Sequence, residues 1–368
     1  MNAGSAFASG LFDCRGDLEA AVDEILNAMN RLSPTTVLRV GLLSRRLPKA
    51  LSPQLQGARL EGKQHSQKRD RKAVSFHYDQ PVPFYGSFLD PELVYSCAYF
   101  DDGVADLDEA QTRKIDYTLA KVRLAPGERL LDIGCGWGAL VIRAAQKFGA
   151  SALGITLSTT QYEEARRRIE QAGVGHLAHV ELRDYRDLPK QSFDKCVSIG
   201  MFEHVGARML PTYFRTVFDL LKPGGLFLNH GIAEQTPGRR GGKVSGFMKR
   251  FVFPDGELVA VSRALLDAER SGFEVRDVES LREHYAETLR HWVRNLERNR
   301  DMAIAIGGEQ TYRVWRLYMA GSAQGFRSGR LGVFQSLLAR PTPSGGVPIP
   351  STRRDLYATN ALIGQSAF

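Results

Sequence analysis

The stretch LDIGCGWG at positions 131–138 is a glycine-rich turn that could hold a ligand. Glycine lets the backbone approach a ligand closely at the carboxyl end of a strand. The spacing matches neither the G-x-G-x-x-G dinucleotide pattern nor a phosphate loop, because no G-K-[ST] follows. An acid inside the turn suits a ligand with amine and hydroxyl donors, such as S-adenosylmethionine (SAM); a nucleotide site or a plain tight turn are the alternatives. The ligand-facing positions would be Asp132, Gly134, Cys135, Gly136 and Gly138.

Strands and helices alternate along the chain around this turn. A short apolar run predicts a buried strand at 129–135, and strands are also predicted at 151–157, 179–185, 193–200 and 225–232. The segments 273–280 and 331–340 could supply two further strands. Helical patterns are predicted at 138–149, 207–221, 281–299 and 301–326, and Ser158 with Gln161 matches a capping box that opens another helix. This alternation predicts an α/β fold with a doubly wound, mostly parallel sheet.

Composition sets limits on the class of protein. The chain has 368 residues, 43% of them hydrophobic and 24% charged, as expected for a globular protein rather than a disordered one. No apolar run is long enough for a spanning helix, and the N-terminus lacks the features of a secretory signal. The four cysteines form no C-x-x-C pair and have no zinc spacing with histidine, so we expect a reducing cytoplasm and no metal site.

The net charge of +8 is concentrated near the N-terminus. Residues 39–72 contain ten Lys or Arg and two acids, next to a Leu- and Val-rich segment at 37–47. Such a stretch favours an anionic partner, and a solvated linker is the alternative. Because no nucleic-acid motif accompanies it, we expect a phospholipid surface rather than nucleic acid. Residues 17–33 predict an amphipathic helix that Asp17 caps, and 52–75 are predicted to be a linker.

Several ordered motifs between about 65 and 340 carry a family resemblance. They are HYD, FY, FLD and YSCAYF within 77–100, GITLSTTQ at 154–161, SIGMFEHVG at 198–206, HYAETLRHW at 284–292, and Trp315, YM, GFRSG and Gln335 within 315–335. Together with LDIGCGWG, these resemble the cyclopropane-fatty-acyl-phospholipid synthases and the mycolic acid cyclopropane synthases. The resemblance implies a Rossmann-like SAM-dependent methyltransferase with a seven-stranded sheet and a small, mainly helical N-terminal module.

The resemblance also implies a reaction and a site. Family members transfer a methylene group from SAM to a cis double bond of an acyl chain, usually in a phospholipid. Methyl transfer leaves a carbocation, and a bound bicarbonate is understood as the base that allows ring closure. By motif matching, the bicarbonate ligands would be Cys97, Glu203, His230, Tyr318 and the backbone of Ile232. The SAM contacts would be the glycine turn and Tyr95, Ser96, Thr156, Leu157, Gln161, Asp184, Tyr185 and Arg186.

Some of these residues also have a purely structural interpretation. Gln161 could only close its capping box, Arg186 could be a solvated charge, and Tyr318 could be core packing. The chain departs from the family pattern at Val82, at Asp255 and at Ser322, and none of these is a proposed bicarbonate ligand. Other outcomes on the same scaffold are a C-methyl or methylene lipid product, a small-molecule N-methyltransferase, or a lipid-binding protein without activity.

We therefore predict three regions: a lipid-associated module with a basic linker at 1–75, a catalytic domain at 76–340 and a flexible tail at 341–368. The expected partners are unsaturated phospholipid acyl chains and an anionic membrane surface. Family members are often dimers, so the resemblance also suggests a homodimer. The expected location is cytoplasmic, peripheral on the inner face of the cell membrane.

Overall fold

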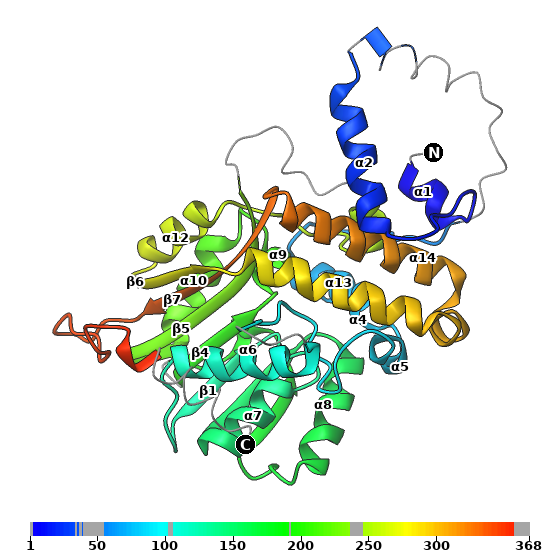
Figure 1. Cartoon of the computed structure of the whole chain (residues 1–368). Coiled ribbons are helices and arrows are strands. Elements are labelled where there is room, and N and C mark those ends of the chain that lie inside the picture. Colours follow the sequence, from blue (N-terminus) through cyan, green and yellow to red (C-terminus); the bar gives the residue numbers. More distant parts are fainter. Residues whose placement is uncertain are drawn as a thin grey trace.

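A seven-stranded sheet forms the centre of the fold in the computed structural model, which describes residues 3–33, 35, 36, 39, 55–101, 106–190, 193–235 and 246–356 (Figure 1). The strand order is β3-β2-β1-β4-β5-β7-β6. Strand β7 runs antiparallel to both of its neighbours, and the other pairs are parallel. The predicted mostly parallel sheet is thus confirmed. Its strands are β1 (Arg129–Ile133), β2 (Ser151–Thr156), β3 (Ala178–Leu182), β4 (Phe193–Ile199), β5 (Leu221–Glu234), β6 (Glu274–Ser280) and β7 (Leu331–Ala339).

Helices cover both faces of the sheet. One face carries α6 (Leu107–Lys121), α7 (Ala139–Phe148) and α8 (Thr159–Gln171), and the other carries α10 (Leu210–Leu220) and α12 (Val261–Arg270). Successive side chains of a strand point to opposite faces, so Leu130 joins the first apolar cluster and Leu131 the second. Both leucines are fully buried. The run of apolar residues in β1 therefore follows from a strand that is covered on both sides.

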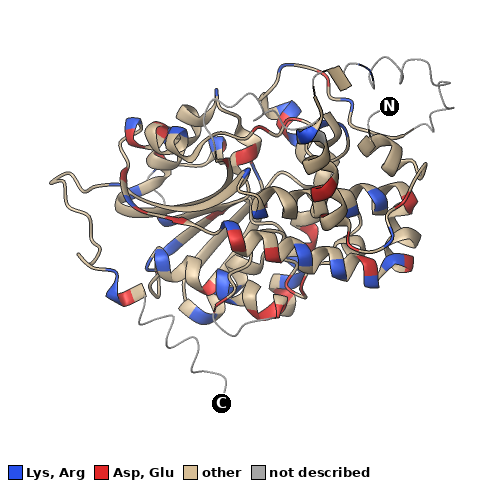
Figure 2. Ribbon diagram, turned by 45° about the horizontal axis from the view of Figure 1, so that its top comes forward, with Lys and Arg blue, Asp and Glu red and all other residues tan. Residues whose placement is uncertain are grey.

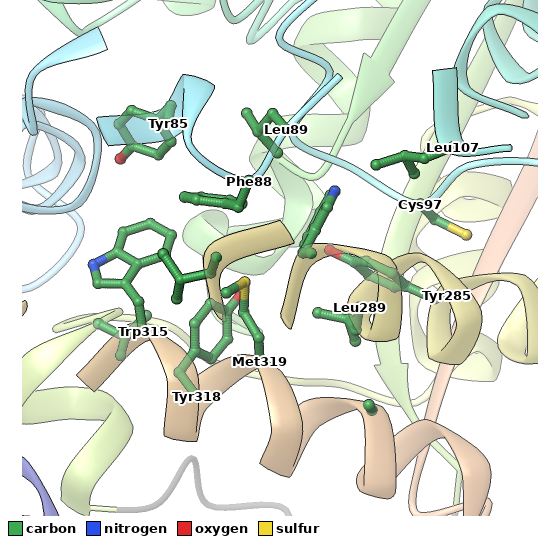
Figure 3. Packing of buried hydrophobic residues seen from close by; sticks show 14 of the residues in the cluster. Tyr85, Phe88, Leu89, Cys97, Leu107, Tyr285, Leu289, Trp315, Tyr318 and Met319 are labelled. Carbon is green, nitrogen blue, oxygen red and sulfur yellow. The ribbon is translucent and has the colours of Figure 1, made fainter. Parts of the chain in front are cut away.

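A third layer of helices lies over the carboxyl ends of the strands. Helices α13 (Arg282–Arg298) and α14 (Arg300–Arg327) run side by side there, as Figure 1 shows. Their inner faces share an apolar cluster with α5 (Val82–Gly86) and α11 (Gly246–Phe251). Figure 3 shows the rings of Tyr85 and Phe88 facing Trp315 and Tyr318 of α14. This layer, with α4 (Gln67–Tyr78), α9 (Phe202–Val205) and the short helix Tyr185–Asp187, surrounds the site.

Two N-terminal helices, α1 (Ala3–Ala8) and α2 (Leu18–Arg31), pack on α14. Phe7 and Leu18 are buried against Ala320, and the side chain of Asp17 accepts a hydrogen bond from the backbone N–H of Ala20 at 3.1 Å. The predicted amphipathic helix and its cap are confirmed. Arg316 of α14 is paired with Asp13 at 3.3 Å, so ionic contacts add to the docking of these helices.

The prediction that residues 52–75 form a linker is wrong for its last part, because α4 covers Gln67–Tyr78. The helix is mostly polar and buries only Ala73 and His77, so apolar periodicity could not reveal it. Its charged residues are used in tertiary contacts instead: Arg69 donates to both oxygens of Asp255, at 2.7 and 2.8 Å. The helix also crosses position 75, where the sequence analysis ends the N-terminal module.

The chain after Arg340 is irregular but makes specific contacts up to residue 356. Arg353 pairs with Asp277 at 2.7 Å, Asp355 pairs with Arg123 at 2.8 Å, and Leu356 is buried. The predicted Leu- and Val-rich segment at 37–47 lies outside the described residues, except for position 39. The basic residues Arg45, Arg46 and Lys49 therefore also lie outside them. The division into three regions, with a tail that begins at 341, stays a prediction.

Charges of both signs are interspersed along the outer helices (Figure 2), and the edge strand β6 also carries several. Among the helices in the described part of the chain, none is long and apolar enough to cross a membrane.

Candidate active site

A first cavity opens at the carboxyl ends of β1 and β2, where the glycine turn lies. Gly134, Gly136 and Gly138 all have positive φ, at 85°, 54° and 87°. The backbone N–H groups of Gly134 and Cys135 both donate to the carbonyl of Ile155, at 2.9 and 3.0 Å, and fix the turn on β2. A Cβ on Gly136 would meet no atom within 4 Å, so this backbone faces open space that a ligand can enter.

The structure gathers nearly all of the predicted SAM contacts around this cavity. Its lining includes Tyr95, Ser96, Asp132, Gly134, Cys135, Gly136, Thr156, Leu157, Gln161, Asp184, Tyr185 and Arg186. Gly138 is the exception, because it lies at the start of α7 and its α-carbon faces Ala165 of α8, to which a Cβ would approach within 3.2 Å. Its place is in the packing of α7 against α8.

Gln161 makes only half of the predicted capping box. Its backbone N–H donates to Ser158 Oγ at 3.2 Å, as the box requires. Its side chain does not return to the Ser158 backbone; instead its Oε1 accepts from Thr156 Oγ1 at 2.7 Å. Thr156 Oγ1 in turn accepts from the backbone N–H of Ser158 at 3.2 Å. These contacts hold the Gln161 amide at the cavity, at the end of β2.

Arg186 is not a solvated charge. Its Nε donates to Asp184 at 2.8 Å, and its Nη2 reaches Asp70 of α4 at 3.1 Å. The hydrogen bond that the guanidinium donates to Asp184 raises the pKa of Arg186 above its ordinary value. Asp70 and Tyr78 of α4 also line the cavity, so this ion pair holds α4 across the opening. Both Asp184 and Arg186 line the cavity at which the sequence predicts them, but the sequence gives no indication of their partner on α4.

Lys114 of α6 is a cavity residue that sequence analysis missed. Its side chain is buried, and its Nζ donates to Ser96 Oγ at 2.8 Å. Burial lowers the pKa of Lys114 to about 8, while nearby Asp90 opposes that shift. A signal was available, since Leu107, Ala110, Lys114, Tyr117 and Lys121 fall at helical spacing on one buried stripe. A lysine on such a stripe must have a partner inside the protein.

The cavity has groups that complement each part of SAM. Asp132, 3% exposed at the end of β1, offers a carboxyl group to amine or hydroxyl donors. Burial raises the pKa of Asp132 to about 7, and Lys114 opposes this. The Lys114 ammonium offers a donor to a carboxylate, and the ring of Tyr185 offers an apolar surface to a base. The residues present therefore fit this cofactor.

A second cavity lies beneath α13 and α14, and all five predicted bicarbonate ligands line it: Cys97, Glu203, His230, Ile232 and Tyr318. Apolar side chains extend the lining, among them Phe247, Met248, Phe253, Leu289 and Phe326. Gly4 of α1 and Leu26 of α2 also belong to it, so the N-terminal helices border this cavity.

The polar side chains of the second cavity leave two buried atoms without a protein partner. Glu203 Oε1 accepts from the backbone N–H of Ile232 at 2.6 Å, whereas Glu203 Oε2 has no partner among the described residues. His230 Nε2 is likewise buried and unpartnered. Since the N–H of Ile232 is used by Glu203, Ile232 offers no free donor to a ligand here. A buried polar atom without a hydrogen bond destabilises the folded protein. Glu203 Oε2 and His230 Nε2 together therefore fit a small ligand that has both donor and acceptor oxygens.

Burial sets the protonation of these groups. It raises the pKa of Glu203 to about 7, although the N–H of Ile232 opposes this, and it raises the pKa of Tyr318 to about 12. Burial also raises the pKa of the Cys97 thiol and holds the pKa of His230 well below its usual value. At neutral pH the thiol, the imidazole and the phenol are therefore uncharged. Tyr318 accepts from the hydroxyl of Tyr95 at 3.1 Å, which leaves its own hydrogen for the cavity.

The two cavities meet at five residues that belong to both linings: Tyr78, Tyr95, Ser96, Gly200 and His204. His204 Nε2 lies 3.4 Å from the hydroxyl of Tyr78, and burial lowers the pKa of His204 to about 4. A ligand in the first cavity can thus approach one in the second at this junction. Among the described residues, no group of three or more His, Cys, Asp or Glu is placed to hold a metal ion.

Several known proteins are similar to this chain in sequence. A family model described as mycolic acid cyclopropane synthetase matches residues 65–336. The chain is 44% identical over 300 residues to a probable fatty acid methyltransferase of Pseudomonas putida, covering 81% of this chain and 76% of that one. It is 38% identical over 290 residues to the tuberculostearic acid methyltransferase UfaA1 of Mycobacterium tuberculosis, covering 76% and 67%.

Solved structures agree with the sequence comparisons. The cyclopropane synthase MmaA2 of M. tuberculosis superposes with a TM-score of 0.69 at 34% identity, covering 73% of this chain and 98% of that one. The mycolic acid cyclopropane synthase CmaA1, complexed with SAH and CTAB, gives the same values. A coclaurine N-methyltransferase, also with a TM-score of 0.69 but only 20% identical, shares the fold.

The fold and these comparisons define a SAM-dependent methyltransferase. Within that class, the chain belongs to the mycolic acid cyclopropane synthetase family.

Proposed function

We propose that this enzyme transfers a methylene group from SAM to the cis double bond of an unsaturated phospholipid acyl chain and forms a cyclopropane, with bicarbonate as the base. The observation that carries the proposal is the junction between the two cavities, which joins the cofactor cavity to one whose lining combines many apolar side chains with the buried polar groups of Glu203 and His230. An isolated alkene is a weak nucleophile, and the sulfonium of bound SAM supplies an electrophilic methyl group. An apolar cavity suits both the acyl chain and a cation that water must not reach.

The residues of the second cavity would hold the bicarbonate. Its hydroxyl matches the unpartnered Glu203 Oε2, and its oxygens match donors on His230 and Tyr318. The Cys97 thiol also lines the cavity but donates to the carbonyl oxygen of Ala98 at 3.2 Å, so here it offers no free hydrogen to the ion. With a pKa of about 7, Glu203 can share a proton with the ion instead of repelling it. Bicarbonate would supply a base for the proton that the cationic chain loses. Glu203 also holds the N–H of Ile232, so it orients the end of β5 beside the ion.

A lipid analysis tests the reaction. The chain is expressed in a bacterium without its own cyclopropane synthase, the cells receive methyl-deuterated methionine, and mass spectrometry examines the fatty-acid esters. We expect a gain of one carbon with two deuteriums and no remaining double bond. Mild hydrogenation would leave that ring unchanged but would add two hydrogens to an exomethylene isomer. No labelled lipid, from a protein that binds SAM, would contradict the phospholipid substrate.

A methyl-branched product is the second candidate. It is favoured by the names of two relatives, a fatty acid methyltransferase and a tuberculostearic acid methyltransferase. Retention of three deuteriums in the same experiment would establish it. The role of bicarbonate is tested separately, by assaying the purified enzyme in buffer stripped of carbon dioxide and then restoring bicarbonate. Activity that does not respond to bicarbonate would contradict the proposed base.

We further propose that the enzyme works on the anionic inner face of the cell membrane. Lys68, Arg71 and Lys72 are exposed on α4, and each cation near an anionic surface contributes about 1 kcal/mol. Changing these three to Gln should weaken binding to phosphatidylglycerol vesicles at least ten-fold at low salt. The control changes Arg166 and Arg167, exposed on α8, to Gln; equal losses in both variants would contradict a specific surface. The homodimer stays a prediction that sedimentation can test.

A further inference from the structure

A chain of hydrogen bonds runs from the second cavity into the protein behind His230. His230 of β5 lies opposite Gln335 of β7, which in turn lies opposite Glu279 of β6. Gln335 Nε2 is 3.2 Å from His230 Nδ1, and Gln335 Oε1 accepts from Lys121 Nζ at 2.8 Å. Lys121, at the end of α6, also pairs with Glu279. Gln335 and Lys121 are each only 1% exposed.

Only one placement of the hydrogens satisfies the hydrogen bonds between Lys121, Gln335 and His230. An ammonium group only donates, so the Gln335 atom that faces Lys121 must be the amide oxygen. The amide nitrogen then faces His230, with Thr118 Oγ1 also near it at 3.5 Å. Because an amide NH₂ only donates, His230 Nδ1 must accept, and the ring proton of the neutral imidazole must sit on Nε2.

The other charges around His230 support a neutral ring. Lys114 and Lys121 are both close enough to oppose a positive charge on the imidazole, and burial opposes it more strongly. His230 Nε2 is the buried atom that has no protein partner and belongs to the lining of the second cavity. The proton on Nε2 is thus presented to whatever occupies the cavity.

We propose that Gln335 and Lys121 are positioning residues that lock His230 as the Nε2–H tautomer and so make it a hydrogen-bond donor to the anion in the second cavity. This rests on the proposed function for the identity of that anion. A consequence concerns the proton that leaves the acyl chain: an imidazole with Nε2 already protonated and Nδ1 engaged cannot accept it. His230 therefore holds the base and is not the base.

Nitrogen NMR on the full chain labelled with ¹⁵N-histidine tests the tautomer without cofactor, bicarbonate or lipid. A His230→Ala variant identifies the signals of this ring among the eight histidines. We expect the hydrogen of the neutral ring to be on Nε2 at pH 7. A proton on Nδ1, or a doubly protonated ring, would overturn the proposal, and this readout needs no activity.

Gln335→Glu is the informative variant, because a carboxylate in place of the amide accepts from Nδ1–H while it still faces Lys121. We expect the proton to move to Nδ1 in this variant. Thr118→Val is the matched control, since it removes the other neighbour of the Gln335 amide and should leave the tautomer as it is. If Gln335→Glu does not fold, Lys121→Met serves instead, and we expect it to release the Gln335 amide and give a mixture of the two tautomers. An unchanged ring in the folded variant would contradict the lock.

The activity of the same proteins at varied bicarbonate concentration gives the second readout. In Gln335→Glu, His230 would no longer donate its Nε2–H to the ion, so the half-saturating bicarbonate concentration should rise about ten-fold or more. The affinity for SAM, measured by calorimetry, should be unchanged. A switched tautomer with an unchanged half-saturating concentration would overturn the positioning role. If even the wild-type enzyme ignores bicarbonate while its tautomer is as expected, the proposed base fails and the lock stands.

Discussion

Glu203→Gln should make the ligand-free protein more stable above pH 7, although it alters the centre of the proposed site. The Glu203 side chain is 8% exposed, and burial raises its pKa from 4.5 to about 7. Because the folded protein favours the protonated form, the free energy of unfolding falls as pH rises from about 4.5 to 7 and is level beyond that. The shift corresponds to about 3 kcal/mol at 1.36 kcal/mol per pKa unit.

The amide of Gln removes this cost because it cannot ionise, and its oxygen can still accept from the N–H of Ile232. With an unfolding entropy of about 2.1 cal/mol/K per residue, about 3 kcal/mol corresponds to a Tm about 4 °C higher for a chain of 368 residues. At pH 5 the two proteins should differ by only about 1 °C, because little of the cost has developed there.

Differential scanning calorimetry at pH 5 and pH 8, in buffer free of carbon dioxide and SAM, measures both values. Glu163→Gln on the exposed face of α8 is the matched control and should leave the Tm unchanged at either pH. A gain of equal size at both pH values would show that the effect is not ionisation. A lower Tm at pH 8 would refute the reasoning, because Glu203 would then be stabilised as a carboxylate by a partner.

Two further predictions concern the cofactor cavity. In Gly154→Ala, the new Cβ would lie 2.7 Å from the Cβ of Cys135. We therefore expect the free energy of unfolding to fall by about 1–3 kcal/mol and SAM binding, measured by calorimetry, to weaken. The control is Gly175→Ala, whose new Cβ would meet no atom within 4 Å and should change neither stability nor SAM binding. Lys114→Met should weaken SAM binding at pH 7 about ten-fold or more by removing a charged donor. Wild-type affinity should itself fall as pH rises past about 8, where Lys114 loses its proton, and the absence of this fall in Lys114→Met would support that assignment.

The sequence determined the parts of this protein that depend on local pattern. Apolar runs identified the central strands such as β1, because a strand covered on both faces is apolar throughout. The edge strand β6, with the sequence EVRDVES, is mostly polar and only partly buried. The glycine turn could be placed at a cavity because positive φ at three positions requires glycine. Ordered motifs identified the family, and they marked Glu203 and His230 as site residues before their surroundings were known.

Only the tertiary structure decided what surrounds those residues. Helix α4 was not predicted because most of its residues are polar and show no apolar periodicity. These residues make ionic contacts in the folded protein instead, such as that of Arg69 with Asp255. Lys114 became a cavity residue only when α6 packed beside β1, and Gln335 reached His230 only through the antiparallel pairing of β5 with β7. Burial, unpaired atoms and shifted pKa values arise from segments far apart in the chain, so a reading of neighbouring residues cannot contain them.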